Sequence, residues 1–352
     1  MIRPRKAVER LQPYRPPLEG RGGKLRLDFN ENTVGCAPQV VRELRRALNS
    51  ELLTRYPEYD ESRRTLARYF QVAPEEMLLT NGTDDAIHLL VDGFANPGDD
   101  VLVVEPSYAM YRFYAERAGA RIRAVRAAPA AGFPAERVVA ELRRRPRLAL
   151  LASPNNPTGA VIPADALRRV LDAAPGTVVF VDEAYFEFCG QSALGWIRRR
   201  RNLVVARTFS KARGLAGLRL GCLLANRQLI TALARAHSPY SVGTAALAAG
   251  LAALRDAPAT RRYAAEVVRA RGYLEKALDG LGIRRFPSGG NFVLVDVGPR
   301  ARRLVAGLAR RGILVRDRRR DFGRIGYVRI TVGSLGQSRR LVRALEALWR
   351  RG

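Results

Sequence analysis

Short apolar runs alternate with longer amphipathic segments between residues 77 and 182 of this 352-residue chain. The apolar runs predict strands and the longer segments predict helices. Strands are expected over 77–80, 100–105, 121–126, 148–152 and 177–182, and helices over 108–119, 135–144 and 164–174. This alternation favours an α/β fold with a mostly parallel sheet flanked by helices, whose ligands bind at the carboxyl ends of the strands.

The two ends of the chain carry different patterns. Prolines and a glycine-rich run before residue 30 discourage regular structure, so an extended arm is expected there. Helical patterns run from about 227 to 281 with an interruption at Ser238-Pro239, and strands over 291–295, 313–316 and 327–332 then mix with helices over 302–311 and from 338. We therefore expect an arm over 1–30, a large domain over 31–245 and a small α+β domain over 246–352.

Lysine is scarce in this chain, which makes one lysine conspicuous. Only Lys6, Lys24, Lys211 and Lys276 stand among 61 basic residues. Lys211 lies in a glycine-rich loop after a predicted buried strand, with Arg219 eight residues further on. A lysine amine can attack a carbonyl to form a Schiff base, which a guanidinium cannot do. The loop suits a phosphorylated carbonyl cofactor, pyridoxal 5′-phosphate, although a solvated lysine would also fit such a loop.

Other polar residues follow predicted strands. The Gly82-Thr83-Asp84 run lies at a strand-to-helix junction, where free N–H groups and the helix dipole favour a phosphate, or where one side chain simply caps the helix. Asp182 ends a buried strand and could pair with a pyridinium nitrogen, or could form a helix cap or an ion pair. Tyr108 could lie on a planar ring or be a half-buried structural tyrosine.

Charge and hydropathy limit the possible partners. The net charge of +28 would suit nucleic acid, but the arginines are spread along the chain and are not interleaved with aromatic residues, so nucleic-acid binding is not expected. The most apolar stretch, 242–254, is too short to cross a membrane, and the N-terminus has no apolar segment typical of a signal peptide.

The cysteines and histidines argue against two kinds of site. Cys36, Cys189 and Cys222 are dispersed and odd in number, which favours reduced thiols in a cytoplasmic protein. His88 and His237 are the only histidines and lie far apart in the sequence. We therefore expect neither a metal site nor a Ser-His-Asp triad.

In their order and spacing, motifs along nearly the whole chain resemble the fold-type I pyridoxal-phosphate-dependent aminotransferases, and most closely their histidinol-phosphate branch. These motifs are Pro13-Tyr14, Asn30-Glu31-Asn32, Arg55-Tyr56-Pro57, Asn81 to Asp84, Ser153 to Gly159, Asp182 to Tyr185, Ser210 to Ala212 with Gly214 to Gly221, Asn291-Phe292, Ile313 to Asp317 and Val328 to Gly333. The chain departs from the family at Thr33, where proline is common, and at Gly243, where asparagine is common.

The resemblance implies roles for residues that would hold the cofactor ring. Lys211 would bind the cofactor as a Schiff base and move a proton between the substrate and the cofactor. Asp182 would pair with the pyridine nitrogen, and Tyr108 would stack on the ring. Asn156 and Tyr185 would hydrogen-bond the phenolic oxygen of the cofactor.

The resemblance also implies a phosphate site and a homodimer with shared active sites. The cofactor phosphate would be held by the strand-to-helix junction at Gly82, by the backbone of Thr83 and Asp84, and by Ser210 and Arg219. Tyr56 would reach that phosphate from the partner subunit. Tyr14, Arg316 and Arg329 would bind the anionic groups of the substrate.

By resemblance, the reaction is transamination between an amino donor and a 2-oxo acid, with histidinol phosphate and 2-oxoglutarate as the expected pair. One alternative is an aromatic amino acid aminotransferase. A threonine-phosphate decarboxylase-like lyase is another, although that group tends to have phenylalanine at Tyr185 and threonine at Ser210. A regulator of the same fold that binds nucleic acid is a third, but no appended helix-turn-helix segment is found in the sequence.

Overall fold

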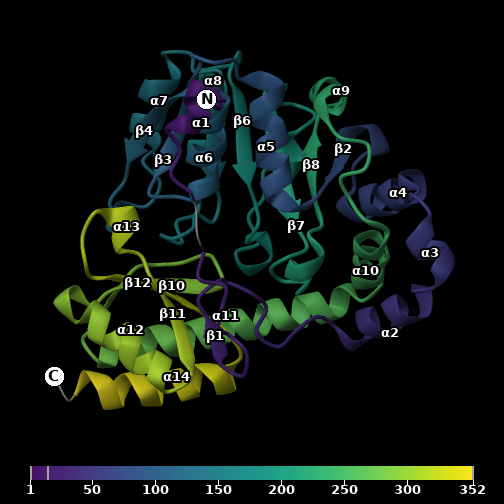
Figure 1. Cartoon of the computed structure of the whole chain (residues 1–352). Coiled ribbons are helices and arrows are strands. Elements are labelled where there is room, and N and C mark those ends of the chain that lie inside the picture. Colours follow the sequence, from purple (N-terminus) through teal and green to yellow (C-terminus); the bar gives the residue numbers. More distant parts are fainter. Residues whose placement is uncertain (1, 14–15, 351–352) are drawn as a thin grey trace.

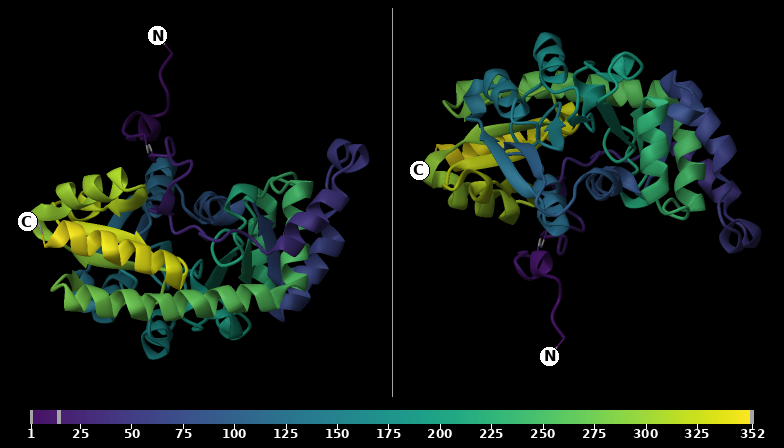
Figure 2. Two further views of the ribbon diagram at one scale, coloured as in Figure 1. Left: turned by 90° about the horizontal axis from the view of Figure 1, so that it is seen from below. Right: turned by 90° about the horizontal axis from the view of Figure 1, so that it is seen from above.

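The structure is a computed structural model that describes residues 2–13 and 16–350. Two β-sheets, each with helices packed on it, lie one above the other in Figure 1. Figure 2 shows the long helix α11 (Ala257–Gly280) running along one side of the molecule. Within the described residues, no helix is both long and apolar enough to cross a membrane.

The larger sheet has seven strands among the described residues. Their order is β2 (Met77–Thr80), β8 (Gly221–Ala225), β7 (Leu203–Thr208), β6 (Val178–Asp182), β5 (Leu148–Ala152), β3 (Asp100–Glu105) and β4 (Arg121–Arg126). All neighbours pair in parallel except those of β8, which is antiparallel to both β2 and β7. The prediction of a mostly parallel sheet flanked by helices is therefore confirmed. Strand β8 was not predicted, because five apolar residues directly after a loop show no alternation by which to recognise a strand.

Helices cover both faces of the larger sheet. On one face, α5 (Gly82–Phe94), α6 (Ala109–Ala118) and α9 (Arg227–Ala236) bury their apolar residues against the strands. On the other face the core is completed by α2 (Pro38–Ala47), α4 (Tyr59–Phe70), α7 (Ala135–Leu142), α8 (Ala164–Ala173) and α10 (Thr244–Arg255), while α3 (Ser50–Thr54) buries none of its residues. Because both faces are covered, β6 and β7 are buried along their whole length, as expected for near-continuous apolar strands.

The smaller sheet has five strands among the described residues, in the order β1 (Leu25–Leu27), β11 (Ile313–Asp317), β12 (Tyr327–Thr331), β10 (Phe292–Asp296) and β9 (Arg284–Arg285). Its core is shared with α11, α12 (Ala301–Arg310) and α14 (Leu335–Trp349), and α13 (Arg319–Phe322) lies between β11 and β12 in the chain. Strand β1 joins the far edge by pairing in parallel with β11.

The first thirty residues are more regular than the sequence indicated. They contain the short helix α1 (Lys6–Glu9) as well as β1. Prolines and glycines indicate only the local backbone preference of the chain. Strand β1 forms because β11, almost 290 residues away, provides its hydrogen-bonding partners.

A second interruption divides the predicted long helical region. Besides the break before α10, Asp256 separates α10 from α11, and its side chain caps α11 by accepting a hydrogen bond from the Ala259 N–H. Helix α10 packs with the core of the larger sheet and α11 with that of the smaller one. The proposed boundaries after residues 30 and 245 stay predictions.

Two buried ion pairs fasten the end of β6 to the end of β7. Arg207 contacts Glu183 at 2.8 Å, with side-chain exposures of 5% and 2%, and both residues hydrogen-bond the hydroxyl of Ser192. Arg213 contacts Glu187 at 2.6 Å. Glu183 and Glu187 lie close after Asp182 and Tyr185 in the chain, and Arg207 and Arg213 flank Lys211. The two ion pairs therefore hold the segment that carries Asp182 and Tyr185 next to the segment that carries Lys211.

We predict that Arg207→Met lowers the free energy of unfolding by about 3–5 kcal/mol, because it leaves the Glu183 carboxylate buried without its partner. Denaturant titration measures this difference, and the double variant Arg207→Met with Glu183→Gln should recover part of it. The control is Arg169→Met, which removes an exposed arginine paired with exposed Glu136 and should leave stability unchanged. Equal effects of Arg207→Met and Arg169→Met would contradict the structural importance of the buried pair.

Candidate active site

A cavity of about 1140 Å³ is lined by residues that follow the strands of the larger sheet and by residues of β11, α13 and β12. Of the fourteen site residues expected from the sequence, eleven line it: Thr83, Asp84, Tyr108, Asn156, Asp182, Tyr185, Ser210, Lys211, Arg219, Arg316 and Arg329. Residues separated by up to 246 positions in the sequence therefore meet at one place.

The remaining three candidates lie elsewhere or outside the description. Gly82 opens α5 beside Arg219, next to the cavity. Tyr56 is 77% exposed and its ring lies 4.6 Å from that of Tyr240, so within one chain it is not part of the cavity. Tyr14 lies outside the described residues.

One end of the cavity is built around the first turn of α5. Arg219 donates to the Ser210 hydroxyl at 3.3 Å and to the Asp84 carboxylate at 3.0 Å. Gly82 has φ +75°, and a Cβ there would lie 2.6 Å from Nη2 of Arg219, so glycine is required for the guanidinium to cross this turn. The buried hydroxyl of Thr83 has no hydrogen-bond partner. Unused donors, a guanidinium and a helix N-terminus together make a site for an anion such as phosphate.

Asp182 lies at the end of β6 and is a buried residue in the wall of the cavity. Its carboxylate accepts hydrogen bonds from the Tyr111 hydroxyl at 2.9 Å and from the Ala184 N–H at 3.0 Å. Burial raises the pKa of Asp182 from 3.8 to about 6, although these two hydrogen bonds act in the opposite direction. A buried carboxylate in this position will bind a cationic ring nitrogen strongly, because nothing else in its immediate surroundings neutralises it fully.

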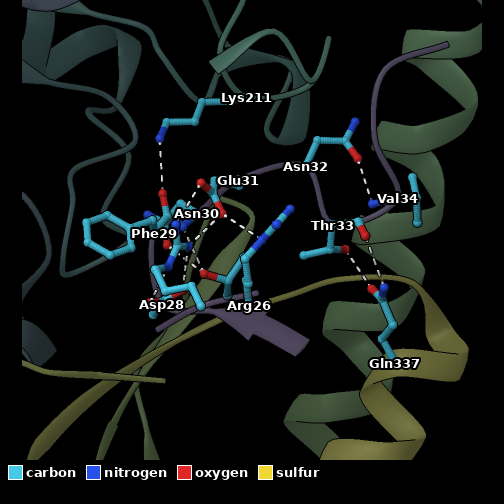
Figure 3. A network of polar contacts seen from close by, with 12 residues as sticks. Arg26, Asp28, Phe29, Asn30, Glu31, Asn32, Thr33, Val34, Lys211 and Gln337 are labelled. Atoms are coloured by element: carbon cyan, nitrogen blue, oxygen red, sulfur yellow. Dashed lines mark hydrogen bonds and ion pairs between the residues drawn. The ribbon is translucent and has the colours of Figure 1, made fainter. Parts of the chain in front are cut away.

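The loop after β7 places Lys211 at the cavity, next to residues that follow β6. Figure 3 shows its Nζ donating to the carbonyl of Phe29 at 3.2 Å. The same Nζ lies 5.7 Å from the centre of the Tyr185 ring. The amine is therefore held in place by weak, reversible contacts, which leaves it available to a carbonyl compound in the cavity.

The segment around Asn30 closes the cavity on the side of the smaller sheet. The Asn30 side chain donates to the Tyr185 hydroxyl at 2.9 Å and accepts from the Thr331 hydroxyl at 3.0 Å. Further along this segment, Thr33 hydrogen-bonds Gln337 at the start of α14 (Figure 3). These contacts connect the arm, the large sheet and the small sheet directly at the candidate site.

Asn156 and Tyr185 can each donate a hydrogen bond to a ligand in the cavity, because their side-chain oxygens already accept one. The side-chain oxygen of Asn156 already accepts a hydrogen bond from Arg329, and the hydroxyl oxygen of Tyr185 accepts one from Asn30. The amide nitrogen of Asn156 and the hydroxyl hydrogen of Tyr185 can then donate to the same ligand oxygen. This arrangement fits a negatively charged oxygen on a planar ring.

Two arginines lie side by side on neighbouring strands of the smaller sheet. Arg316 on β11 lies opposite Arg329 on β12 in the antiparallel ladder, and both line the cavity. Arg329 is only 4% exposed and donates to neutral oxygens, those of Asn156 and of the Asp28 backbone. Burial, together with the nearby positive charges of Arg318 and Arg316, lowers the pKa of Arg329 to about 9, so it stays protonated at neutral pH.

Two contacts were not anticipated from the sequence. Tyr111 is fully buried, bonds Asp182, and packs edge-on against Tyr108 with ring centres 5.9 Å apart. Its spacing of three residues from Tyr108 on a predicted helix places both on one face, and this signal could have identified it. Asn30 offered no such signal, because its partners lie 155 and 301 residues away. Within the described residues, no group of His, Cys, Asp and Glu is placed to hold a metal ion.

Comparisons with known proteins give a consistent result. The family "Aminotransferase class I and II" matches residues 23–348. The histidinol-phosphate aminotransferase of Symbiobacterium thermophilum is 40% identical, covering 97% of this chain and 98% of that protein. The crystal structure of histidinol-phosphate aminotransferase from Sinorhizobium meliloti, in complex with pyridoxal-5′-phosphate, has a TM-score of 0.89 at 25% identity and covers 100% of this chain and 98% of its own. Aspartate aminotransferase from Thermus thermophilus with maleate has a TM-score of 0.80 at 26% identity, over 92% and 91%.

The burial of Asp182 predicts how stability of the ligand-free protein depends on pH. Its folded pKa of about 6 lies above the unfolded value of 3.8, so ionisation of Asp182 opposes folding, and stability is lost as pH rises from about 4 to about 6. Asp182→Asn should therefore stabilise the ligand-free protein at pH 7.5 by up to about 3 kcal/mol, with no gain at pH 4.

Denaturant titrations of wild type and variant at both pH values measure this effect. Asp165→Asn, a change at an exposed aspartate in the first turn of α8, serves as the control and should show no comparable pH-dependent gain. A loss of stability in Asp182→Asn at pH 7.5 would contradict the prediction.

Proposed function

The chain belongs to the aminotransferase class I and II family, and from this premise we propose that it transfers an amino group from histidinol phosphate to 2-oxoglutarate. The enzyme is a pyridoxal-phosphate-dependent aminotransferase, in keeping with the family and with the solved relative that binds this cofactor. The curated relatives named histidinol-phosphate aminotransferase support the choice of substrate.

The cavity fits pyridoxal phosphate on its own geometry. The unpartnered Thr83 hydroxyl, Ser210, Arg219 and the first turn of α5 suit its phosphate, and buried Asp182 suits its ring nitrogen. Tyr108 is oriented by its hydrogen bond to Asp84 at 2.7 Å, which supports a role as the residue that covers the ring. When bound, the cofactor supplies an electron sink for the electron pair left at the substrate Cα.

We assign the remaining steps to residues of this chain. The Lys211 Nζ would bind the cofactor covalently and, once the substrate amine has displaced it, would move a proton from the substrate Cα to the cofactor. Asp182 would keep the ring nitrogen protonated, and the Tyr111 hydrogen bond would keep Asp182 in place. Asn156 and Tyr185 would donate to the phenolic oxygen, since both have a donor directed to the cavity.

The facing guanidiniums of Arg316 and Arg329 are the observation that carries the choice of a phosphorylated substrate. Arg329 bonds only neutral oxygens among the described residues, and Arg316 lies over the Phe29 ring with its charge 5.1 Å from the ring centre. Neither pairing neutralises the charge. Two positive charges at the far end of the cavity favour a dianion over the uncharged ring of an aromatic amino acid. An aromatic substrate would use only one of them, through its α-carboxylate.

We further propose that the enzyme is a cytoplasmic homodimer whose subunits share their active sites. Tyr56 and Tyr240 form an exposed aromatic pair, and Leu53 on α3 is 70% exposed. Such apolar surface is typical of a contact face. Reaching from that face, Tyr56 would contact the phosphate of the cofactor in the partner subunit. The free thiols of all three cysteines are compatible with a reducing compartment.

Shared sites can be tested by mixing two inactive variants. Lys211→Ala lacks the reactive amine, and Tyr56→Ala would lack the residue lent to the partner. In a mixed dimer one site regains both residues, so an equimolar mixture, after exchange of subunits, should recover about a quarter of the wild-type sites. Steady-state assays before and after exchange measure this recovery. No recovery would contradict a shared site.

Substrate choice is tested by kinetics on two donors. We predict that kcat/KM for histidinol phosphate exceeds that for phenylalanine by at least about tenfold, and that Arg316→Ala narrows the gap by about 1.5–3 kcal/mol, the range for charge-assisted hydrogen bonds. Arg302→Ala, a change on the exposed side of α12, is the matched control. A wild-type preference for phenylalanine, or an unchanged ratio in Arg316→Ala, would favour the aromatic alternative.

A further inference from the structure

The segment that follows β11 adds charge to the far end of the cavity. Arg318 and Asp321 both line the cavity, next to Arg316 and Arg329. The backbone N–H of Arg318 donates to the carbonyl of Tyr327 at 2.9 Å, which extends the β11–β12 ladder by one residue and fixes Arg318 beside the two arginines. Arg318 is 8% exposed although it lies just beyond the end of a strand.

Arg318 and Asp321 form an ion pair at 2.8 Å. The pair is not isolated from the arginines, because Arg318 and Arg316 both help to lower the pKa of Arg329 after the larger effect of its burial. Burial raises the pKa of Asp321, while the charges of Arg318, Arg329 and Arg316 act against this rise. One carboxylate is therefore within electrostatic reach of three guanidiniums.

The charge balance of this cluster is uneven. Among the buried and half-buried residues at this end, Arg316, Arg318 and Arg329 contribute three positive charges and Asp321 one negative charge, which leaves two positive charges in a partly desolvated space. Asp317 is paired with the exposed Arg319, and Arg320 is exposed, so neither changes this balance. Like charges held close together in such a space are unfavourable until an anion enters. A phosphate monoester carries a charge of about −1.5 to −2 at pH 7, and so matches the excess.

We propose that Arg318 is a specificity-determining residue that contacts the phosphate of the substrate, and that the phosphate competes with Asp321 for its guanidinium. This inference rests on the proposed function and deepens it. Arg316 and Arg329 already favour a dianion over an uncharged ring, although either guanidinium also pairs with a carboxylate. The third arginine favours the doubly charged group, so the substrate class is a phosphate monoester of an amino compound.

Two variants that break the same ion pair have opposite predicted effects. Arg318→Gln removes a charge that contacts the phosphate, so the ratio of kcat/KM for histidinol phosphate to that for unphosphorylated histidinol should fall by about tenfold to a hundredfold, through KM, with kcat nearly unchanged. Asp321→Asn removes the competing carboxylate and leaves Arg318 in place, so KM for histidinol phosphate should stay the same or fall. If the pair were merely structural, both variants would lose the preference together.

Steady-state kinetics of the holoenzyme with both donors provide the test. Arg318→Lys, which keeps the charge, should retain part of the preference that Arg318→Gln loses. The control is Arg324→Gln, which changes an exposed arginine of the same segment that pairs with Asp296 at 2.7 Å and does not line the cavity. Its ratio should equal that of wild type.

The outcomes separate this inference from the function on which it rests. A wild-type enzyme that does not prefer histidinol phosphate to histidinol would overturn both. A wild-type preference that survives in Arg318→Gln, or that falls equally in Arg318→Gln and Asp321→Asn, would overturn only the role of Arg318.

Discussion

The parallel pairing of β6 with β7 is the contact on which the rest of the site depends. In this register Asp182 lies opposite Ala206, and the chain then runs on to Ser210 and Lys211 at the same edge of the sheet. Because parallel strands expose their carboxyl ends together, the acid and the amine reach one cavity from neighbouring strands. The two buried arginine–glutamate pairs beside them keep these ends from separating.

The sequence predicted those parts of the molecule whose cause is local. The strands over 100–105, 121–126 and 148–152 begin and end as expected. The first and third are mainly apolar runs, and 121–126 places arginines between apolar residues. Lys211 could be singled out because lysine is scarce in the chain and this one lies in a glycine-rich loop after a predicted buried strand. Strand β1 and the Asn30 contacts could not be predicted, since they depend on partners more than 150 residues away in the chain. Tyr111 could be predicted only in part. Its helical spacing from Tyr108 is evident in the sequence, but its hydrogen bond to Asp182 is not.

Charge is distributed differently at the two ends of the cavity. At the cofactor end, Arg219 is paired with Asp84, and we assign buried Asp182 to the ring nitrogen of the cofactor. At the substrate end, arginines outnumber acids, and the excess lies among buried or half-buried side chains. The very high net charge of the chain is therefore not needed to explain the site. What matters is that three of its arginines converge where a substrate phosphate would lie.

Identification of the residue that binds the cofactor tests this account most directly. Borohydride reduction of the purified holoenzyme, followed by proteolysis and mass spectrometry, fixes the cofactor to the amine that carries it. The account predicts a pyridoxyl group on Lys211, the one lysine that lines the cavity among the described residues. A label on Lys276, or no label on any lysine, would contradict it.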